Sequence, residues 1–243
     1  MSQIFIYALV TGLSLLLGAG VGIYFNLKQK TIAGFMAFGA GVLICALTFG
    51  LMEQAFNHGG FDAVILGFLL GGVIFVLGDW IIHLLGGRKH KRKQLIPTNA
   101  DGSGFAITLG TILDGIPESM ALGIALFAGK GEGILMVVAI ALANFPEGIS
   151  SVPGLVKEGF GKKKIIFLWA LVAIVCILVA VGSFAFLRDL DPNNLGILEA
   201  FSAGAILAML ADSMMPEAYE EGGFIIGMLT VLGFLTAFII SRF

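Results

Sequence analysis

Two short segments place a proline and a glutamate inside runs of otherwise apolar residues. They read ILDGIPESMA and ALANFPEGIS, so that Pro117-Glu118 recurs 29 residues later as Pro146-Glu147. Each segment carries a second polar side chain at helical spacing: Asp114 lies four residues before the first glutamate, and Asn144 lies three residues before the second. In a helix, each of these pairs shares one face.

The four side chains of Asp114, Glu118, Asn144 and Glu147 suit a divalent cation. Carboxylate and amide oxygens are hard donors, and each proline leaves the carbonyl four residues earlier without its N–H partner. Two facing carboxylates repel unless a cation lies between them. The alternative is a proline-kinked helix pair whose glutamates are protonated and bonded to neighbouring helices. Two copies of the motif in related positions favour the cation site.

The composition indicates an all-α polytopic membrane protein. Hydrophobic residues make up 58% of the 243 residues and charged residues 12%, with a mean hydropathy of +1.01; about a quarter of an ordinary soluble domain is charged. Long apolar runs in lipid are helices, because a helix satisfies its own backbone hydrogen bonds. We expect a single transmembrane domain, 1–243, with eight transmembrane helices at 4–26, 31–56, 61–86, 103–128, 133–156, 164–187, 195–219 and 222–241.

The connections between these helices differ in charge. The longest is a basic loop, 87–102, and a second basic cluster spans 157–164. With eight helices, one face carries 11 Lys and Arg residues and the other 3. Since basic loops remain in the cytoplasm, we expect loop 87–102 to be cytoplasmic, next to anionic lipid headgroups, and both termini to be extracellular. The first segment lacks the basic start of a signal peptide.

An internal repeat links two distant helices. Residues 37–61 align without gaps to residues 200–224, with ten of 25 positions identical. The copies belong to the second and seventh expected helices, so they cross the membrane in opposite directions. Inverted repeats of this kind enclose the binding site in many secondary transporters, and here the fourth and fifth helices lie between them in a 3+2+3 arrangement. The alternative is a chance similarity between apolar helices rich in small residues.

Three further acidic residues lie in or near the repeat: Glu53, Asp212 and Glu217. An ionisable side chain at membrane depth is expensive and usually faces the interior of the bundle. Asp212 and Glu217 are equally compatible with an ion path and with pairing at helix ends. Glu53 is one position away from Glu217 in the repeat alignment and is a third candidate for the path.

Other function classes find little support. The chain contains no H-E-x-x-H, no G-x-S-x-G and no P-loop, so we expect neither an enzyme nor an ATP-driven pump. Cys45 and Cys176 lie in separate apolar runs and indicate neither a disulfide framework nor a Cys-based metal site. We expect no prosthetic group and no nucleic-acid partner. Whether the protein forms a homodimer is a question that the sequence leaves open.

The sequence resembles the ZIP family of divalent metal transporters, especially its bacterial GufA-like and ZupT-like branch. The resemblance rests on DGIPES, ANFPEG, the basic loop and MLADSMMPEAYEEGG. It implies eight transmembrane helices, both termini outside, and a binuclear metal site between the fourth and fifth helices. It also implies transport of zinc, and often iron, manganese or cadmium, into the cytoplasm.

The site departs from the family pattern in three places. Asp114 stands where the family has histidine, and Gly115 and Ala143 offer no side-chain ligand. A site without imidazole or thiolate should discriminate less between Zn²⁺ and Mn²⁺ or Mg²⁺. The resemblance carries Glu118, Glu147 and Asn144 over as ligands.

Together these features predict a transporter of divalent cations, zinc first, in a bacterial or archaeal cell membrane. Two alternatives remain open at this point. One is a metal-sensing or structural membrane protein on a degenerate ZIP scaffold, without transport. The other is proton-coupled transport of a different small solute.

Overall fold

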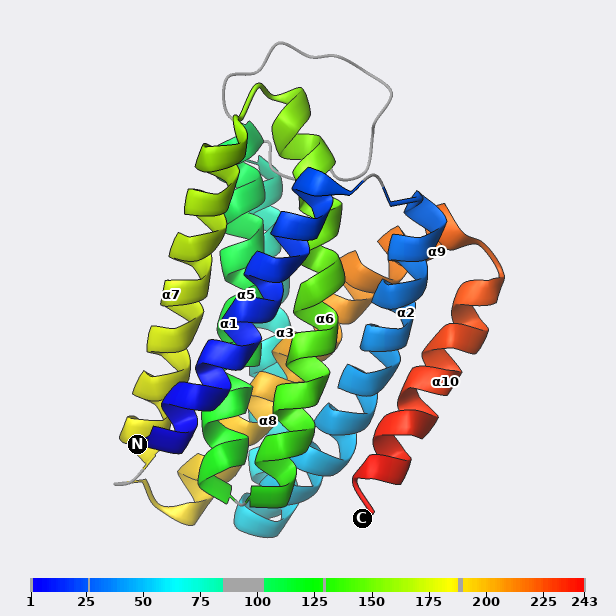
Figure 1. The fold of residues 1–243 in the computed structure, drawn as a ribbon. Helices are drawn as coiled ribbons and strands as arrows, with labels where there is room; N and C mark the ends of the chain where they lie inside the picture. The colour runs from blue at the N-terminus through cyan, green and yellow to red at the C-terminus, as the bar shows by residue number, and fades with distance from the viewer. Residues whose placement is uncertain (1, 26, 85–102, 129, 188–189, 243) are drawn as a thin grey trace.

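The computed structural model describes residues 2–25, 27–84, 103–128, 130–187 and 190–242. Helices account for nearly all of these residues, as the composition predicts, and they pack into an elongated bundle (Figure 1). The elements are α1 (Ser2–Tyr24), α2 (Gln29–Ala46), the π-helix η1 (Leu47–Met52), α3 (Glu53–Leu84), α5 (Ser103–Ala128), α6 (Lys130–Lys157), α7 (Lys162–Phe186), α8 (Pro192–Met209), the π-helix η3 (Leu210–Met214), α9 (Met215–Gly222) and α10 (Ile225–Ile240). The predicted basic loop, 87–102, lies outside the described residues.

Six helical stretches of the described chain are long and apolar enough to cross a membrane. One of them runs for 54 residues, Gln29–Ile82, and α10 adds a shorter apolar helix of 16 residues. The long stretch is interrupted inside α3 at Gly60, which has φ 66° and ψ −164°. Only glycine adopts this backbone conformation readily. The chain therefore turns at Gly60, so α3 consists of two helical arms, one before and one after this residue. A criterion of length and composition alone treats Gln29–Ile82 as one span.

Many large apolar side chains face outward and several polar ones are buried inside, as expected for a protein in contact with lipid. Phe61, Phe167 and Leu178 are among the large hydrophobic side chains left exposed on the outside of the bundle. The buried polar side chains are Thr11, Gln54, Thr111, Asp114, Glu118, Ser119, Asn144, Ser151, Glu199 and Ser202. Within the described residues, the candidate sites lie among these buried polar side chains and their neighbours.

The helices form two sets that meet along the centre of the bundle. In one set α1 packs on α6 and α7, and α5 packs on α7; in the other α3 packs on α8, and α2 packs on α10. The sets are joined by contacts of α2 with α6 and of α5 with α8. Figure 1 shows α1, α6 and α7 on one side of the molecule and α2 and α10 on the other.

The two copies of the internal repeat share their backbone irregularities. The π-helices begin at Leu47 and Leu210, and each copy ends at a glycine with positive φ, Gly60 (66°) and Gly223 (70°). Both pairs are separated by 163 residues, the offset of the sequence repeat. In Figure 1, α2 runs from the top of the view to the bottom and α8 in the opposite direction. Chance similarity of apolar composition does not explain matching irregularities at matching positions.

The prolines of the two motifs lie inside continuous helices. Pro117 lies in α5, and α6 contains both Pro146 and Pro153. The carbonyl of Leu142, which loses its partner to Pro146, lies close to α2: a Cβ added to Gly39 would be 3.0 Å from its oxygen.

Candidate metal site

The motif residues lie on two neighbouring helices. Asp114 and Glu118 belong to α5, Asn144 and Glu147 to α6, and α5 packs against α6. The exposed fraction is 7% for Asp114, 1% for Glu118 and 7% for Asn144, while Glu147 is partly exposed. Glu118 interacts electrostatically with both Glu147 and Asp114. Three carboxylates therefore lie in one region of the bundle interior.

Glu118 carries an unsatisfied atom. Its Oε1 is buried and has no hydrogen-bond partner among the residues that the structure describes. A buried acceptor without a partner costs about 1–3 kcal/mol, and more if it is charged. A bound cation would satisfy this oxygen and offset the repulsion from the two neighbouring carboxylates.

Asn144 is oriented by a third helix. Its Nδ2 donates to the backbone carbonyl of Thr11 on α1, at 3.2 Å. Because the amide nitrogen is held by α1, Oδ1 is the atom of this side chain that can meet a cation. The contact is close because α1 and α6 pack through glycines: a Cβ at Gly18 or Gly148 would collide with backbone of the opposite helix.

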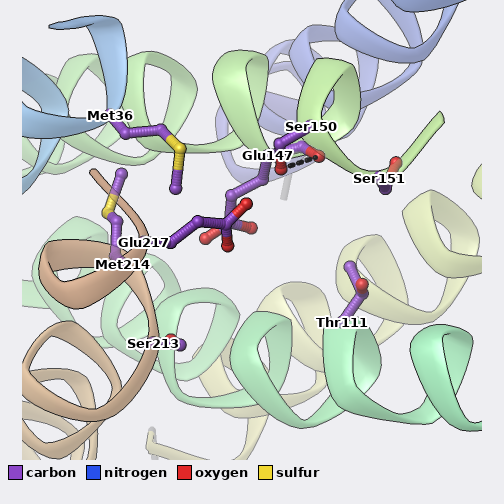
Figure 2. A pocket seen from close by; sticks show the side chains of 8 residues that line it. All are labelled: Met36, Thr111, Glu147, Ser150, Ser151, Ser213, Met214 and Glu217. Atoms are coloured by element: carbon purple, nitrogen blue, oxygen red, sulfur yellow. Dashed lines mark hydrogen bonds between the residues drawn. The ribbon is translucent and has the colours of Figure 1, made fainter. Parts of the chain in front are cut away.

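A small pocket extends from Glu147 (Figure 2). Its volume is about 10 Å³, room for about one water molecule. Glu147 of α6 and Glu217 of α9 both extend into it, from different walls. The lining residues are Met36, Thr111, Glu147, Ser150, Ser151, Ser213, Met214 and Glu217. The structure thus brings a predicted ligand and a predicted path residue, 70 positions apart in the sequence, to one pocket.

The other two path candidates lie outside this lining. Asp212 is partly buried in η3, next to the lining residue Ser213. Glu53 is exposed in the first turn of α3. Across the described part of the chain, no group of three or more His, Cys, Asp or Glu side chains is close enough to hold a metal ion.

Several pocket residues were missed by the sequence reasoning, although a signal was present for some. Ser150 and Ser151 follow Glu147 by three and four residues, and Thr111 precedes Asp114 by three. These are the spacings of one helical face, so the same rule would have found them. Met36 and Met214 carry no such signal, because methionine is common in apolar helices.

The positions without a ligand are filled by packing. Ala143 is fully buried, and a Cβ added to Gly39 of α2 would lie 3.2 Å from its Cα. At Gly115 a Cβ would lie 2.7 Å from the Sγ of Cys176 on α7. The thiol of Cys176 also hydrogen-bonds the side chain of Ser119 and interacts with Glu118. No sequence signal connects Cys176 with the site, since the apolar run of α7 carries no motif that shows which helix Cys176 faces.

Comparison with known proteins adds an independent observation. A model of the family described as ZIP zinc transporter matches residues 86–241. Zinc transporter ZupT of Salmonella typhimurium is 28% identical over 232 residues, which cover 90% of this chain and 88% of that protein; ZupT of Salmonella enteritidis gives the same values. An Arabidopsis thaliana protein named "Putative zinc transporter At3g08650" is 27% identical over 186 residues, 75% of this chain, and this chain spans 29% of its length.

Proposed function

The chain belongs to the ZIP zinc transporter family, and from this premise we propose that it carries divalent metal cations, zinc first, across the membrane into the cytoplasm. The observation that carries the proposal is the state of Glu118. This carboxylate is almost completely buried, it interacts with two other carboxylates, and its Oε1 lacks a hydrogen-bond partner within the described chain. A bound divalent cation is the simplest explanation for the burial of Glu118, its two carboxylate neighbours and its unpartnered oxygen.

The proposed ligands are Asp114 and Glu118 from α5 and Asn144 and Glu147 from α6. In the described structure the three carboxylates are not close enough to hold one ion together, so the proposal requires them to move closer when the ion binds. An ion that leaves this site meets the small pocket, where Glu147 and Glu217 supply carboxylates and the serines supply hydroxyl groups. Asp212 and Glu53 are proposed as further path residues. Iron, manganese and cadmium are proposed as additional substrates.

The thiol of Cys176 supports zinc among these metals. Its Sγ lies beside Gly115, a position at which the family pattern described above has a ligand, and thiolates favour Zn²⁺ and Cd²⁺ over Mn²⁺ and Mg²⁺. We include Cys176 as a proposed ligand, in place of the missing side chain on α5. This revises the expectation, drawn from the sequence, of a site with oxygen donors alone.

For the membrane arrangement we propose eight spans in a 3+2+3 order, with the arms on either side of Gly60 and the short α10 each counted as a span. The shared irregularities of the two repeat copies support an inverted pair. Alternating access then consists of a movement between the two helix sets at the α2–α6 and α5–α8 contacts. The excess of Lys and Arg on one side supports a proposed orientation with both termini outside.

The test is metal flux into liposomes. We expect uptake of ⁶⁵Zn²⁺ by the wild-type protein and loss of at least about 90% of it in Glu118→Ala with Glu147→Ala, because the two charges that hold the ion are gone. The matched control is Glu220→Gln with Glu221→Gln, which also removes two carboxylates, from exposed positions.

Three outcomes would reject the proposal. Equal fluxes in the wild type and the Glu118/Glu147 variant would show that the carboxylates carry no ion. Saturable zinc binding in detergent without any flux would instead identify a metal-sensing or structural protein. Flux that depends on a pH gradient but not on any metal would point to a different solute.

A further inference from the structure

We propose that the contact between α3 and α8 contains a second cation-binding site, formed by His58, Glu199, Gln54 and Ser202 and suited to a first-row divalent cation such as Zn²⁺. This site shares no residue with the one between α5 and α6. It does not depend on the transport proposal, because binding can be measured without flux.

The core of the site is a pair of metal-binding side chains from distant parts of the chain. Nδ1 of His58 lies 2.9 Å from Oε2 of Glu199. The side chain of Glu199 is 0% exposed and that of His58 is 33% exposed. One partner is thus sealed inside the bundle while the other is reached from outside, so an ion would have access past the imidazole.

Gln54 and Ser202 lie one helical turn further into the bundle than His58 and Glu199, and both have polar atoms without a hydrogen-bond partner among the described residues. Gln54 is 9% exposed, and both its Nε2 and its Oε1 lack a hydrogen-bond partner in the part of the chain that the structure describes. The buried Oγ of Ser202 is unpartnered in the same sense. Each such group costs about 1–3 kcal/mol, and native proteins bury few of them without a reason.

The packing of the helices places these atoms beside the His58–Glu199 pair. A Cβ at Gly196 would lie 2.8 Å from the carbonyl oxygen of Ala55, and one at Gly59 would lie 3.2 Å from that of Asn193. The arm before Gly60 and the start of α8 therefore run antiparallel. Gln54 precedes His58 by one turn and Ser202 follows Glu199 by one turn, so both lie at the next level into the bundle, where η1 also contacts α8.

The donor set fits a first-row divalent ion. Imidazole and carboxylate bind Zn²⁺ at about 2.0–2.2 Å, which puts nitrogen and oxygen about 3.3 Å apart around a tetrahedral ion. The observed separation of 2.9 Å needs to widen by only a few tenths of an ångström. The amide oxygen of Gln54 and the hydroxyl of Ser202 are the groups that could complete the coordination from the inner side.

A purely structural ion pair explains less. It accounts for the contact between His58 and Glu199, but it leaves Gln54 and Ser202, one helical turn away along α3 and α8, buried and unsatisfied. A cation site also accounts for the buried oxygens of Gln54 and Ser202, because each oxygen could donate a lone pair to the ion.

Nuclear magnetic resonance of ¹⁵N-histidine protein in detergent tests the site. The chain has three histidines, and His58→Gln identifies the resonances of His58 by their loss. In Glu118→Gln with Glu147→Gln, which weakens the α5–α6 site, we expect Zn²⁺ to shift the Nδ1 resonance of His58. If zinc leaves this resonance unchanged, or moves it only when Glu118 and Glu147 are intact, the proposal is wrong.

Equilibrium dialysis with ⁶⁵Zn²⁺ supplies the second measurement. In the same Glu118/Glu147 background, Gln54→Leu keeps the His58–Glu199 pair and removes one inner donor. We expect zinc affinity to fall at least about tenfold, since even groups outside the coordination shell change affinity by 10–100-fold. Unchanged affinity would contradict a role for Gln54, and with it the inner half of the site.

Discussion

Glu118 is the side chain whose burial is hardest to explain without a cation. It lies beside two other carboxylates in the interior of a lipid-facing bundle, and one of its oxygens has no partner within the described chain. Binding sites commonly hold charges at a cost to the stability of the empty protein. The same arrangement therefore predicts opposite effects on stability and on activity.

Glu118→Gln tests this opposition. Replacing the carboxylate with an uncharged group of the same shape removes a repulsive buried charge. We therefore expect the free energy of unfolding of the metal-free variant to rise by about 1–3 kcal/mol. Zinc uptake should fall at least about tenfold, because the ion loses a charged ligand. Thermal unfolding followed by the fluorescence of the buried Trp169, with liposome flux, measures both. A variant that lost stability and kept its flux would refute this account of Glu118.

Cys176→Ser tests the proposed thiol ligand. Serine keeps the size of the side chain and replaces a soft donor with a hard one, so we expect the preference for Cd²⁺ over Mn²⁺ to fall at least about tenfold. The measurement is competition of the two metals against ⁶⁵Zn²⁺ uptake. Cys45→Ser, at the other buried cysteine, is the matched control and should leave the preference unchanged. If the wild type and both variants show the same preference for Cd²⁺ over Mn²⁺, Cys176 is not a ligand.

At the scale of elements, close contacts between helix backbones position the candidate sites. Gly41 meets the carbonyl of Thr230 on α10, and Gly204 meets that of Phe68 on α3. These two glycines occupy equivalent places in the repeat. Without side chains at the contact, helices approach closely enough for dispersion and Cα–H contacts to hold them, which lipid-exposed apolar side chains alone cannot do.

Gly204→Ala is expected to destabilise the protein by about 1–3 kcal/mol, because its Cβ would collide with the backbone of Phe68, which cannot move aside alone. Gly227→Ala, on a helix position with open space around it, is the control and should be neutral or stabilise by up to about 1 kcal/mol. Thermal unfolding in detergent compares the two. Equal unfolding temperatures would mean that the α3–α8 contact tolerates a wider separation.

At the scale of the whole molecule, orientation follows from charge, and the fold offers convenient positions to test it. Ser241 is exposed near the end of the described chain, and a Cβ at Gly161, between α6 and α7, would meet open space. The two positions should lie on opposite sides of the membrane, Ser241 outside and Gly161 in the cytoplasm.

Labelling of single cysteines in intact cells measures this orientation. A membrane-impermeant maleimide should modify Ser241→Cys at once and Gly161→Cys only after the cells are opened. The native cysteines are buried and should give a low background in the unaltered protein. The reverse pattern would place both termini in the cytoplasm and would contradict the direction of transport proposed above.

The sequence by itself determined the class of the protein and much of its candidate site. Apolar runs of about 20 residues leave a lipid-embedded chain no alternative to helices, and nearly all of the described residues are helical. The spacing of Asp114 with Glu118 and of Asn144 with Glu147 is a local property of a helix. For that reason it could be read before any fold was known, as could the repeat that matches Gly60 to Gly223.

Only the tertiary structure decided which distant residues meet. Four contacts join helices that are far apart in the chain. They are the hydrogen bond of Asn144 to Thr11, the thiol of Cys176 beside Gly115, the shared pocket of Glu147 and Glu217, and the contact of His58 with Glu199. Helical periodicity specifies the face on which a side chain lies, but not the helix that this face meets. That choice depends on the packing of small residues between backbones, which requires all the helices at once.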